Sequence, residues 1–443
     1  MKWVKRGLWV GAWGAWAWLG FGLHRELPRD LGPVVCKLPF GDDRWPVGFI
    51  DGGDVLVTKS GTGVISIPAI GHAMDCWNAR TGKRLGGVKS IRIDRWGHDP
   101  PARAVRHGFV FGEGTGPKDA ASRTEVWNLS TGEGKPLPYP FTSMLDLHQT
   151  RPLAAITSDS NLDRKARIGF LDLEANRIIG EWATDGGRST ANETIAAGYF
   201  LDDADEFLVV LRRSNGQSHR LVRCSFNGSP HPGSITLQGE YSAFSRPRGG
   251  RMSARNGFAN SIDTTVFDVH SGERLWSATK RADGADFVWW SNLGAVPIIS
   301  RNGRCILHDD GLIDVETCQP VWRPRELAER ASLENEDGNS FWVMENWKTL
   351  LSRFDFEEAF TTWALRDLND GRLLVRLHNG PLELNQSRTL SATTSGTIYP
   401  WPASVNYPFF VLCQSILALP LILLWAMLRW RRKRRMRMTS IAA

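Results

Sequence analysis

Two acidic clusters contain the residue types that could hold a divalent cation. Residues 202–206 read Asp-Asp-Ala-Asp-Glu, and residues 334–338 read Glu-Asn-Glu-Asp-Gly. Carboxylate oxygens are the ligands that Ca²⁺ and Mg²⁺ prefer. Both clusters precede an apolar run, where polar turn residues are common, and neither has the ligand spacing of an EF-hand loop. We therefore interpret both clusters as turns and assign no metal ligand to them.

Two further segments have only part of the pattern of a phosphate-binding or catalytic loop. Residues 112–118, Gly-Glu-Gly-Thr-Gly-Pro-Lys, lack the Gly-Lys-Ser/Thr ending of a phosphate loop and a helical pattern after it. Residues 308–311, His-Asp-Asp-Gly, are more typical of a hairpin turn than of an acid–base pair or a metal site. The ten histidines show no paired ligand spacing. The sequence thus assigns no catalytic, cofactor-binding or metal-binding residue and no cofactor.

Six cysteines, at positions 36, 76, 224, 305, 318 and 413, show neither a CxxC motif nor zinc spacing. Cys305 and Cys318 flank one predicted hairpin, so they could form a disulfide in an oxidising compartment. Their register across the hairpin decides whether the two Cα atoms come close enough to be bridged. The sequence leaves both the paired and the free state open.

One short pattern recurs through the middle of the chain: an aromatic or apolar residue, Asp or Asn, an apolar residue, two turn residues and often Gly. The Asn or Asp stands at positions 78, 128, 172, 268, 314 and 367, at intervals of 50, 44, 96, 46 and 53 residues. A degenerate copy at residues 222–228 divides the interval of 96. This period is the one expected of propeller blades.

The pattern has a physical reason. A strand ends at the aromatic–Asp pair, and the Asp or Asn side chain can accept a hydrogen bond from the backbone two residues on, which starts a turn. Gly then supplies the positive φ that lets the chain reverse. Short β-rich runs precede each turn, for example residues 206–211 and 340–343, so that each period contains three to four strands. Only residues 324–335 have a helical pattern.

The predicted fold is all-β: a seven- or eight-bladed β-propeller of four-stranded antiparallel blades over residues 40–404. Residues 388–401 would supply strands that close the ring. The alternative is an array of two-sheet sandwiches.

Two kinds of motif in the repeat resemble those of known propellers. Trp77-Asn78 and Trp127-Asn128 resemble the Trp-Asp end of a WD repeat, and residues 268–276 resemble the Asp-x-x-Thr-Gly-x-x-x-Trp motif of quinoprotein blades. The chain thus resembles the WD-repeat and quinoprotein-like β-propellers of bacteria. It departs from the WD pattern because Gly-His precedes the strand clearly only at Gly71-His72. The quinoprotein resemblance would imply a bound quinone, calcium and a catalytic Asp, which no local motif here assigns.

Residues 408–428 form an apolar segment of 21 residues within a stretch that holds no charge between Arg388 and Arg429. As a helix it would span about 31 Å, the thickness of a bilayer core. Aromatic residues flank both of its edges, as in interfacial belts. The sequence predicts a transmembrane helix over residues 405–429 and a basic tail over residues 430–443.

Residues 7–23 also hold no charge, and they follow Lys2, Lys5 and Arg6. This is the layout of a cleaved signal peptide or of an uncleaved signal-anchor helix. Residues 15–17, Ala-Trp-Ala, could be a cleavage site, but cleavage there would leave an apolar mature end. Both alternatives stay open for residues 1–23, and residues 24–39 are predicted to be a linker.

The basic residues gather at the two ends of the chain. Seven Lys and Arg residues lie in 429–437 and three in the first six positions, and removing them from the net charge of +7 leaves about −3 for the rest. The positive-inside rule then places both ends in the cytoplasm and the propeller on the outer side of a plasma or inner membrane. A mildly acidic propeller argues against a nucleic-acid partner.

The expected function is that of a membrane-anchored, extracytoplasmic binding or scaffolding module. Its expected partners are the lipid bilayer and a protein or peptide held at one propeller face. We expect a binding protein more than an enzyme because no catalytic constellation stands out. The alternatives are a quinoprotein-like oxidoreductase and a propeller hydrolase, which would need two carboxylates converging in the channel.

Overall fold

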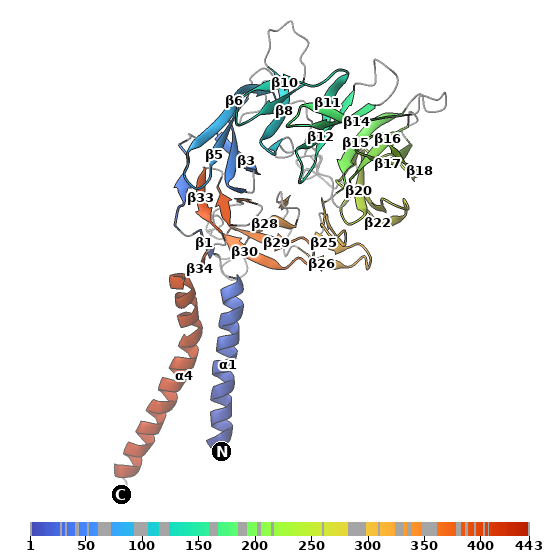
Figure 1. Ribbon diagram of the computed structural model, residues 1–443. Helices are drawn as coiled ribbons and strands as arrows, with labels where there is room; N and C mark the ends of the chain where they lie inside the picture. The colour runs from blue at the N-terminus through green and yellow to red at the C-terminus, as the bar shows by residue number, and fades with distance from the viewer. Residues whose placement is uncertain are drawn as a thin grey trace.

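The computed structural model describes residues 2–26, 29–31, 33–39, 44–50, 53–60, 72–92, 105–114, 124–158, 167–184, 193–201, 205–213, 217–258, 261–281, 298–308, 311–323, 332–334, 339–346, 361–377, 382–385, 389–393, 396–401, 404–405 and 407–441. The described strands form eight blades of antiparallel sheet. Figure 1 shows the blades arranged in a ring. Two helices leave the ring together on one side.

The first four blades follow one another along the chain. Blade 1 consists of β3 (Arg44–Ile50), β4 (Val55–Ser60), β5 (His72–Asn78) and β6 (Arg84–Arg92). Blade 2 consists of β7 (Val105–Arg106), β8 (Phe109–Gly114), β9 (Thr124–Asn128) and β10 (Gly134–Pro136), and the end of β8 also pairs with β6. Blade 3 consists of β11 (Phe141–Leu147), β12 (Leu153–Ser158), β13 (Arg167–Asp172) and β14 (Arg177–Ala183). Blade 4 consists of β15 (Thr194–Phe200), β16 (Glu206–Arg212), β17 (Ser218–Ser225) and β18 (Pro230–Gln238).

Blades 5 to 7 repeat this order. Blade 5 consists of β19 (Ala243–Phe244), β20 (Arg251–Phe258), β21 (Ser261–Asp268) and β22 (Arg274–Arg281). Blade 6 consists of β23 (Ile298–Ile299), β24 (Cys305–His308), β25 (Gly311–Asp314) and β26 (Pro320–Trp322). Blade 7 consists of β27 (Ser332–Glu334), β28 (Ser340–Asn346), β29 (Thr361–Asp367) and β30 (Leu373–Leu377). Of the segment with a helical pattern, residues 324–331 lie outside the described residues, and β27 occupies the next three positions, where the helical prediction is wrong.

Blade 8 closes the ring with strands from both ends of the chain. It consists of β31 (Glu383–Leu384), β32 (Leu390–Ala392), β33 (Thr397–Pro400) and, as its outermost strand, β2 (Cys36–Lys37). Cys36 pairs with Ile398 and Lys37 with Thr397. The prediction of seven or eight blades is therefore confirmed with eight, and the segment predicted to close the ring supplies two of the strands of the last blade.

The predicted turns form the hairpin between the last two strands of blades 1 to 7. The Oδ1 atom of Asn78 accepts hydrogen bonds from the N–H groups of Arg80 and Thr81, and the Asn or Asp of five further copies does the same for one or both of the corresponding groups. Gly82 and Gly272 follow with φ of 68° and 75°. In these hairpins the N–H of the glycine donates to the carbonyl of the Asn or Asp four residues earlier, and the left-handed conformation at this position favours glycine.

Two blades put another residue at the left-handed position of this hairpin. Asn176 has φ of 49° and Cys318 has φ of 56°. Blade 4 differs more from the pattern, because Ser225 occupies the position of the Asn or Asp. Its carbonyl accepts the N–H of Gly228, three residues on, whereas in blade 1 the carbonyl of Asn78 accepts the N–H of Gly82, four residues on. This turn is one residue shorter, which explains why the fourth copy of the pattern is degenerate.

The buried apolar side chains form eight clusters in the described part of the chain, and each cluster lies between two neighbouring blades. Side chains along one strand alternate between the two sides of a blade. In β16, Phe207 and Val209 face blade 3, whereas Leu208 and Val210 face blade 5. The core is thus a ring of interfaces, and each blade is held by both of its neighbours.

The two helices are α1 (Lys2–Glu26) and α4 (Tyr407–Ile441). They join the ring through β1 (Arg29–Asp30) and β34 (Ser404–Val405), which pair with each other. β1 also pairs with the end of β30, so both short strands extend blade 7 outward. Residues 29–37, part of the predicted linker, therefore contribute two strands to the ring.

Candidate functional site

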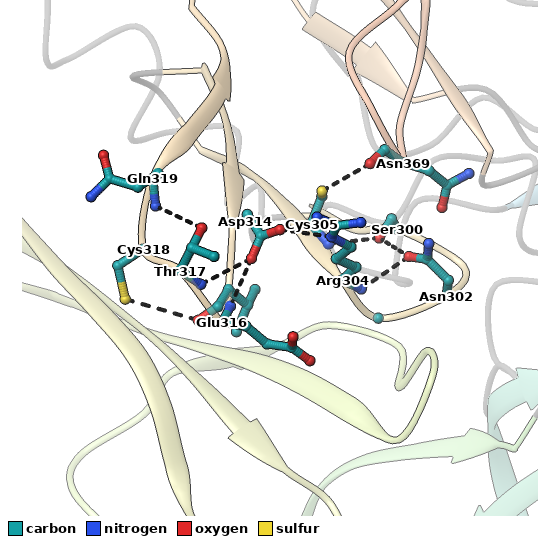
Figure 2. Close-up of polar contacts among 12 residues, drawn as sticks. Ser300, Asn302, Arg304, Cys305, Asp314, Glu316, Thr317, Cys318, Gln319 and Asn369 are labelled. Atoms are coloured by element: carbon teal, nitrogen blue, oxygen red, sulfur yellow. Dashed lines mark hydrogen bonds and ion pairs between the residues drawn. The ribbon is translucent and has the colours of Figure 1, made fainter.

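Polar side chains organise the turns of blade 6, as Figure 2 shows. These turns lie on the side of the ring that carries the hairpins between the last two strands of the blades, which we call the turn-bearing edge. The Asp314 carboxylate accepts hydrogen bonds from the N–H groups of Glu316 and Thr317, both at 3.0 Å, and from Arg304 Nε at 2.7 Å. The Thr317 N–H and the Arg304 guanidinium lower the pKa of Asp314 to about 2. Asp314 is therefore a fixed anion that anchors a turn, and it does not act as a proton carrier near neutral pH.

Arginine side chains also join blade 5 to blade 6 at this edge. Arg251 donates through Nη2 to Glu316 Oε1 at 2.7 Å and through Nη1 to the carbonyl of Gly303 at 3.0 Å. Arg248 donates to the carbonyl of Ile299 at 3.0 Å. These contacts join the start of β20 in blade 5 to the turns on either side of β24 and β25 in blade 6.

The repeat supplies a matched test of this turn. Asp314→Ala should lower the free energy of unfolding by about 1–2 kcal/mol, because two N–H groups lose their acceptor. Asp314→Asn should cost less than about 1 kcal/mol, because Asn78 and Asn128 make the same turn bonds in blades 1 and 2. Urea denaturation of the three proteins checks the order, and equal losses for Ala and Asn would contradict this role.

The structure leaves Cys305 and Cys318 free. The Cys305 thiol is buried and donates to the carbonyl of Asn369 in blade 7 at 3.0 Å, whereas Cys318 is exposed and its thiol points to the carbonyl of Val315. The disulfide alternative is thus contradicted, because the two thiols point in different directions. Burial raises the pKa of Cys305 to about 11, so this thiol is inert.

A second polar cluster links the first strands of three blades; we call Asp146, His148, Phe200 and Arg246 the inner-strand cluster. Asp146 is the next-to-last residue of β11, Phe200 ends β15, and Arg246 follows β19. These are neighbouring first strands of blades 3, 4 and 5. Asp146 forms an ion pair with Arg246 and accepts the N–H of Phe200 at 2.9 Å. Both charged side chains are only 9% exposed. The cluster therefore ties three blades together with a desolvated ion pair.

His148 lies beside this ion pair and is also buried. Its Nδ1 accepts the N–H groups of Thr150 and Arg151, both at 3.2 Å, as an asparagine would in a turn. Burial, followed by the positive charge of Arg151, lowers the pKa of His148 to about 4. The imidazole is neutral in the folded protein at physiological pH.

This lowered pKa predicts a loss of stability in mild acid. The unfolded chain binds a proton at His148 below about pH 6.5, whereas the folded chain binds it only near pH 4, so stability falls as pH decreases through this window. The loss from this group at pH 5 should be about 2 kcal/mol. Denaturation at pH 7.5 and pH 5 should show a smaller difference for His148→Asn, which keeps the acceptor. An unchanged pH difference in that variant would contradict the assignment.

The candidate positions from the sequence fall into ordinary roles or outside the described residues. Asp205 pairs with Arg151 at 2.6 Å, and Glu206 begins β16 beside Arg223. His308 and Gly311 face each other across the hairpin of β24 and β25, as predicted. Residues 112–114 belong to β8, and residues 115–118, 202–204, 309–310 and 335–338 lie outside the described residues. Within the described ranges, no three His, Cys, Asp or Glu side chains are grouped to hold a metal ion.

The residues that carry the family resemblance serve the fold. Trp77 is buried between blades 8 and 1 and donates to Thr58 Oγ1 at 2.9 Å. Trp276 is buried between blades 5 and 6. Asp268 accepts the N–H groups of its turn, and these bonds lower its pKa although burial opposes them. The motifs thus account for turns and blade packing.

The second helix of the chain, α4, contains a long apolar segment. Its segment Phe410–Arg431 is long and apolar enough to cross a bilayer. Val411, Ile416 and Leu423 on this segment are 58–60% exposed. Large apolar side chains rarely cover the surface of a water-exposed helix.

No protein-family model and no curated protein match the chain. Solved structures resemble it at low identity. Kuenenia stuttgartiensis hydrazine synthase is 10% identical, with 81% of this chain and 97% of that chain covered and a TM-score of 0.38. The Dos1 propeller is 9% identical over 84% of this chain and 95% of that chain, with a TM-score of 0.45. TolB from Acinetobacter baumannii is 13% identical over 54% of each chain, with a TM-score of 0.31.

Proposed function

We propose that the chain is a membrane-anchored β-propeller that binds a protein or peptide on the outer side of the membrane. The observation that carries the anchoring is the exposed apolar surface of Phe410–Arg431, which lipid would cover. The basic residues from Arg429 to Arg437 would lie on the cytoplasmic side. The ring would then stand outside, joined to the membrane through blades 7 and 8.

The binding role is supported by how the ring uses its polar groups. In the described residues, the buried charges of the inner-strand cluster and of Asp314 are engaged in joining blades and turns. Exposed charges such as Glu316 and Arg304 stand on the turn-bearing edge, where a partner could reach them. Propeller folds host many functions, so this assignment depends on the site and not on the fold.

Membrane extraction tests the anchoring. The chain should stay in the membrane pellet after alkaline carbonate treatment, and a larger fraction of the double variant Ile416→Arg/Leu423→Arg than of the unaltered chain should appear in the supernatant, because charge near the bilayer centre costs about 2.5–3.5 kcal/mol per residue. Val321→Arg is the matched control, since Val321 is an exposed apolar residue on the ring. Release of the unaltered chain by carbonate would refute the anchoring.

Site-specific photocrosslinking in native membranes tests the binding role. A photocrosslinking amino acid in place of Glu316, which is 68% exposed on the turn-bearing edge, should give one reproducible crosslinked product with the partner. A probe at Ile179, exposed on the outer strand of blade 3, is the control and should give none or a different one. Absence of a specific adduct at every face of the ring would refute a binding role.

A further inference from the structure

The two helices leave the ring from adjacent strands. Arg29 of β1 pairs with Val405 of β34, and Asp30 pairs with Ser404. Two residues separate β1 from α1, and one residue separates β34 from α4. Neighbouring strands lie about 4.8 Å apart, so the strand pair brings the two helix ends together. The chain enters through one helix and leaves through the other, and the helices run side by side in opposite directions (Figure 1).

The helices contact each other through a stripe of small and polar residues near the ring. On α4, Gln414 and Ala418 are buried, whereas Ile416 and Leu419 are exposed. On α1, Gly20 is buried against the Gln414 side chain, and a Cβ added at Gly20 would lie only 2.8 Å from Gln414 Cδ. The indole N–H of Trp16 donates to the backbone carbonyl of Gln414 at 3.2 Å. Small residues permit this close approach in membrane helix pairs.

Gln414 is the one amide side chain between Phe410 and Arg429. Its side chain is buried by α1, and among the described atoms neither its Oε1 nor its Nε2 has a hydrogen-bond partner. An amide that faces hydrocarbon without a partner costs about 2–7 kcal/mol. This cost applies with or without α1, because the amide has no partner among the described atoms when α1 is present. The case for the helix pair therefore rests on the close packing of Gly20 against Gln414 and on the hydrogen bond from Trp16.

We propose that α1 is retained in the mature protein as a second transmembrane helix and pairs with α4 through Gly20, Trp16 and Gln414. This proposal rests on the proposed membrane anchoring. It selects the signal-anchor alternative over cleavage and makes the anchor an antiparallel two-helix hairpin. Both ends of the chain would then lie on the cytoplasmic side.

Two measurements on the full chain test the proposal. Intact-mass analysis of the protein purified from membranes should give a chain that still contains residues 2–26. Separately, the variant Gly20→Cys/Gln414→Cys, in a Cys318→Ser/Cys413→Ser background, should form a disulfide between its two new cysteines when it is oxidised within the membrane. The two thiols are then blocked, so the oxidised protein should react with two fewer molecules of a maleimide-coupled polymer than the reduced protein. The depth-matched control is Trp18→Cys/Ile416→Cys, because both positions are exposed and face away from the helix contact.

The outcomes separate this proposal from the proposed function. A retained helix with selective linking of the contact pair supports the hairpin. A chain that resists carbonate but begins after α1, or whose two cysteine pairs react equally, overturns the hairpin and leaves the anchoring by α4 intact. A chain that is not held in the membrane overturns the anchoring itself.

Discussion

Replacing Asp146 by asparagine should lower the free energy of unfolding by about 3–5 kcal/mol, because a buried guanidinium loses its carboxylate. Asp146 and Arg246 are each only 9% exposed, so water cannot solvate the Arg246 guanidinium once the carboxylate is gone. Asparagine keeps an acceptor for the N–H of Phe200, which isolates the effect of the charge. Denaturation at neutral pH measures the loss.

The partner of this ion pair supplies the control. Arg246→Met alone leaves the Asp146 carboxylate buried without its guanidinium and should be comparably destabilising. The double variant Asp146→Asn/Arg246→Met should recover much of the loss, because no uncompensated charge remains. Additive losses in the double variant would show that the two side chains do not act as a pair.

Phe207→Ala should cost about 3–5 kcal/mol, because it opens a cavity in the interface between blades 3 and 4. Phe207 is fully buried, and its ring lies 5.0 Å from the ring of Phe200 and 5.5 Å from that of Phe170, measured between centroids. Calorimetry or urea denaturation of the purified protein measures the effect.

An exposed aromatic residue gives the matched truncation. Tyr139 is 88% exposed, so Tyr139→Ala should change the free energy of unfolding by less than about 0.5 kcal/mol. Similar effects of the two truncations would mean that the interface between blades 3 and 4 does not hold the ring together.

The sequence predicts the blades well because their turns are local. The Asn or Asp of each hairpin bonds to the backbone two or three residues on, so its pattern appears directly along the chain. Cys318 shows the limit of such reasoning: it takes the left-handed position that glycine holds in other blades, and its spacing from Cys305 suggests a disulfide that does not form.

The inner-strand cluster could not be predicted, because its members come from different blades. Asp146 and Arg246 are one hundred positions apart in the chain and belong to no repeated pattern. The closing strand β2 was missed for the same reason, since Cys36 and Lys37 pair with Ile398 and Thr397 near the other end of the chain and leave no local signal. Gln414 did have a signal, an amide within an apolar span, but its partner Gly20 lies near the other end of the chain.

The exposed thiol of Cys318 offers the most direct test of the proposal that the ring lies on the outer, non-cytoplasmic side of the membrane. The other cysteines described in the ring are buried or half-buried, so a membrane-impermeant maleimide should react mainly at this position. The maleimide should label the unaltered protein in intact spheroplasts, and this labelling should disappear in the variant Cys318→Ser. If Cys318 reacts only after the cells are lysed, the ring lies on the cytoplasmic side and the account is wrong.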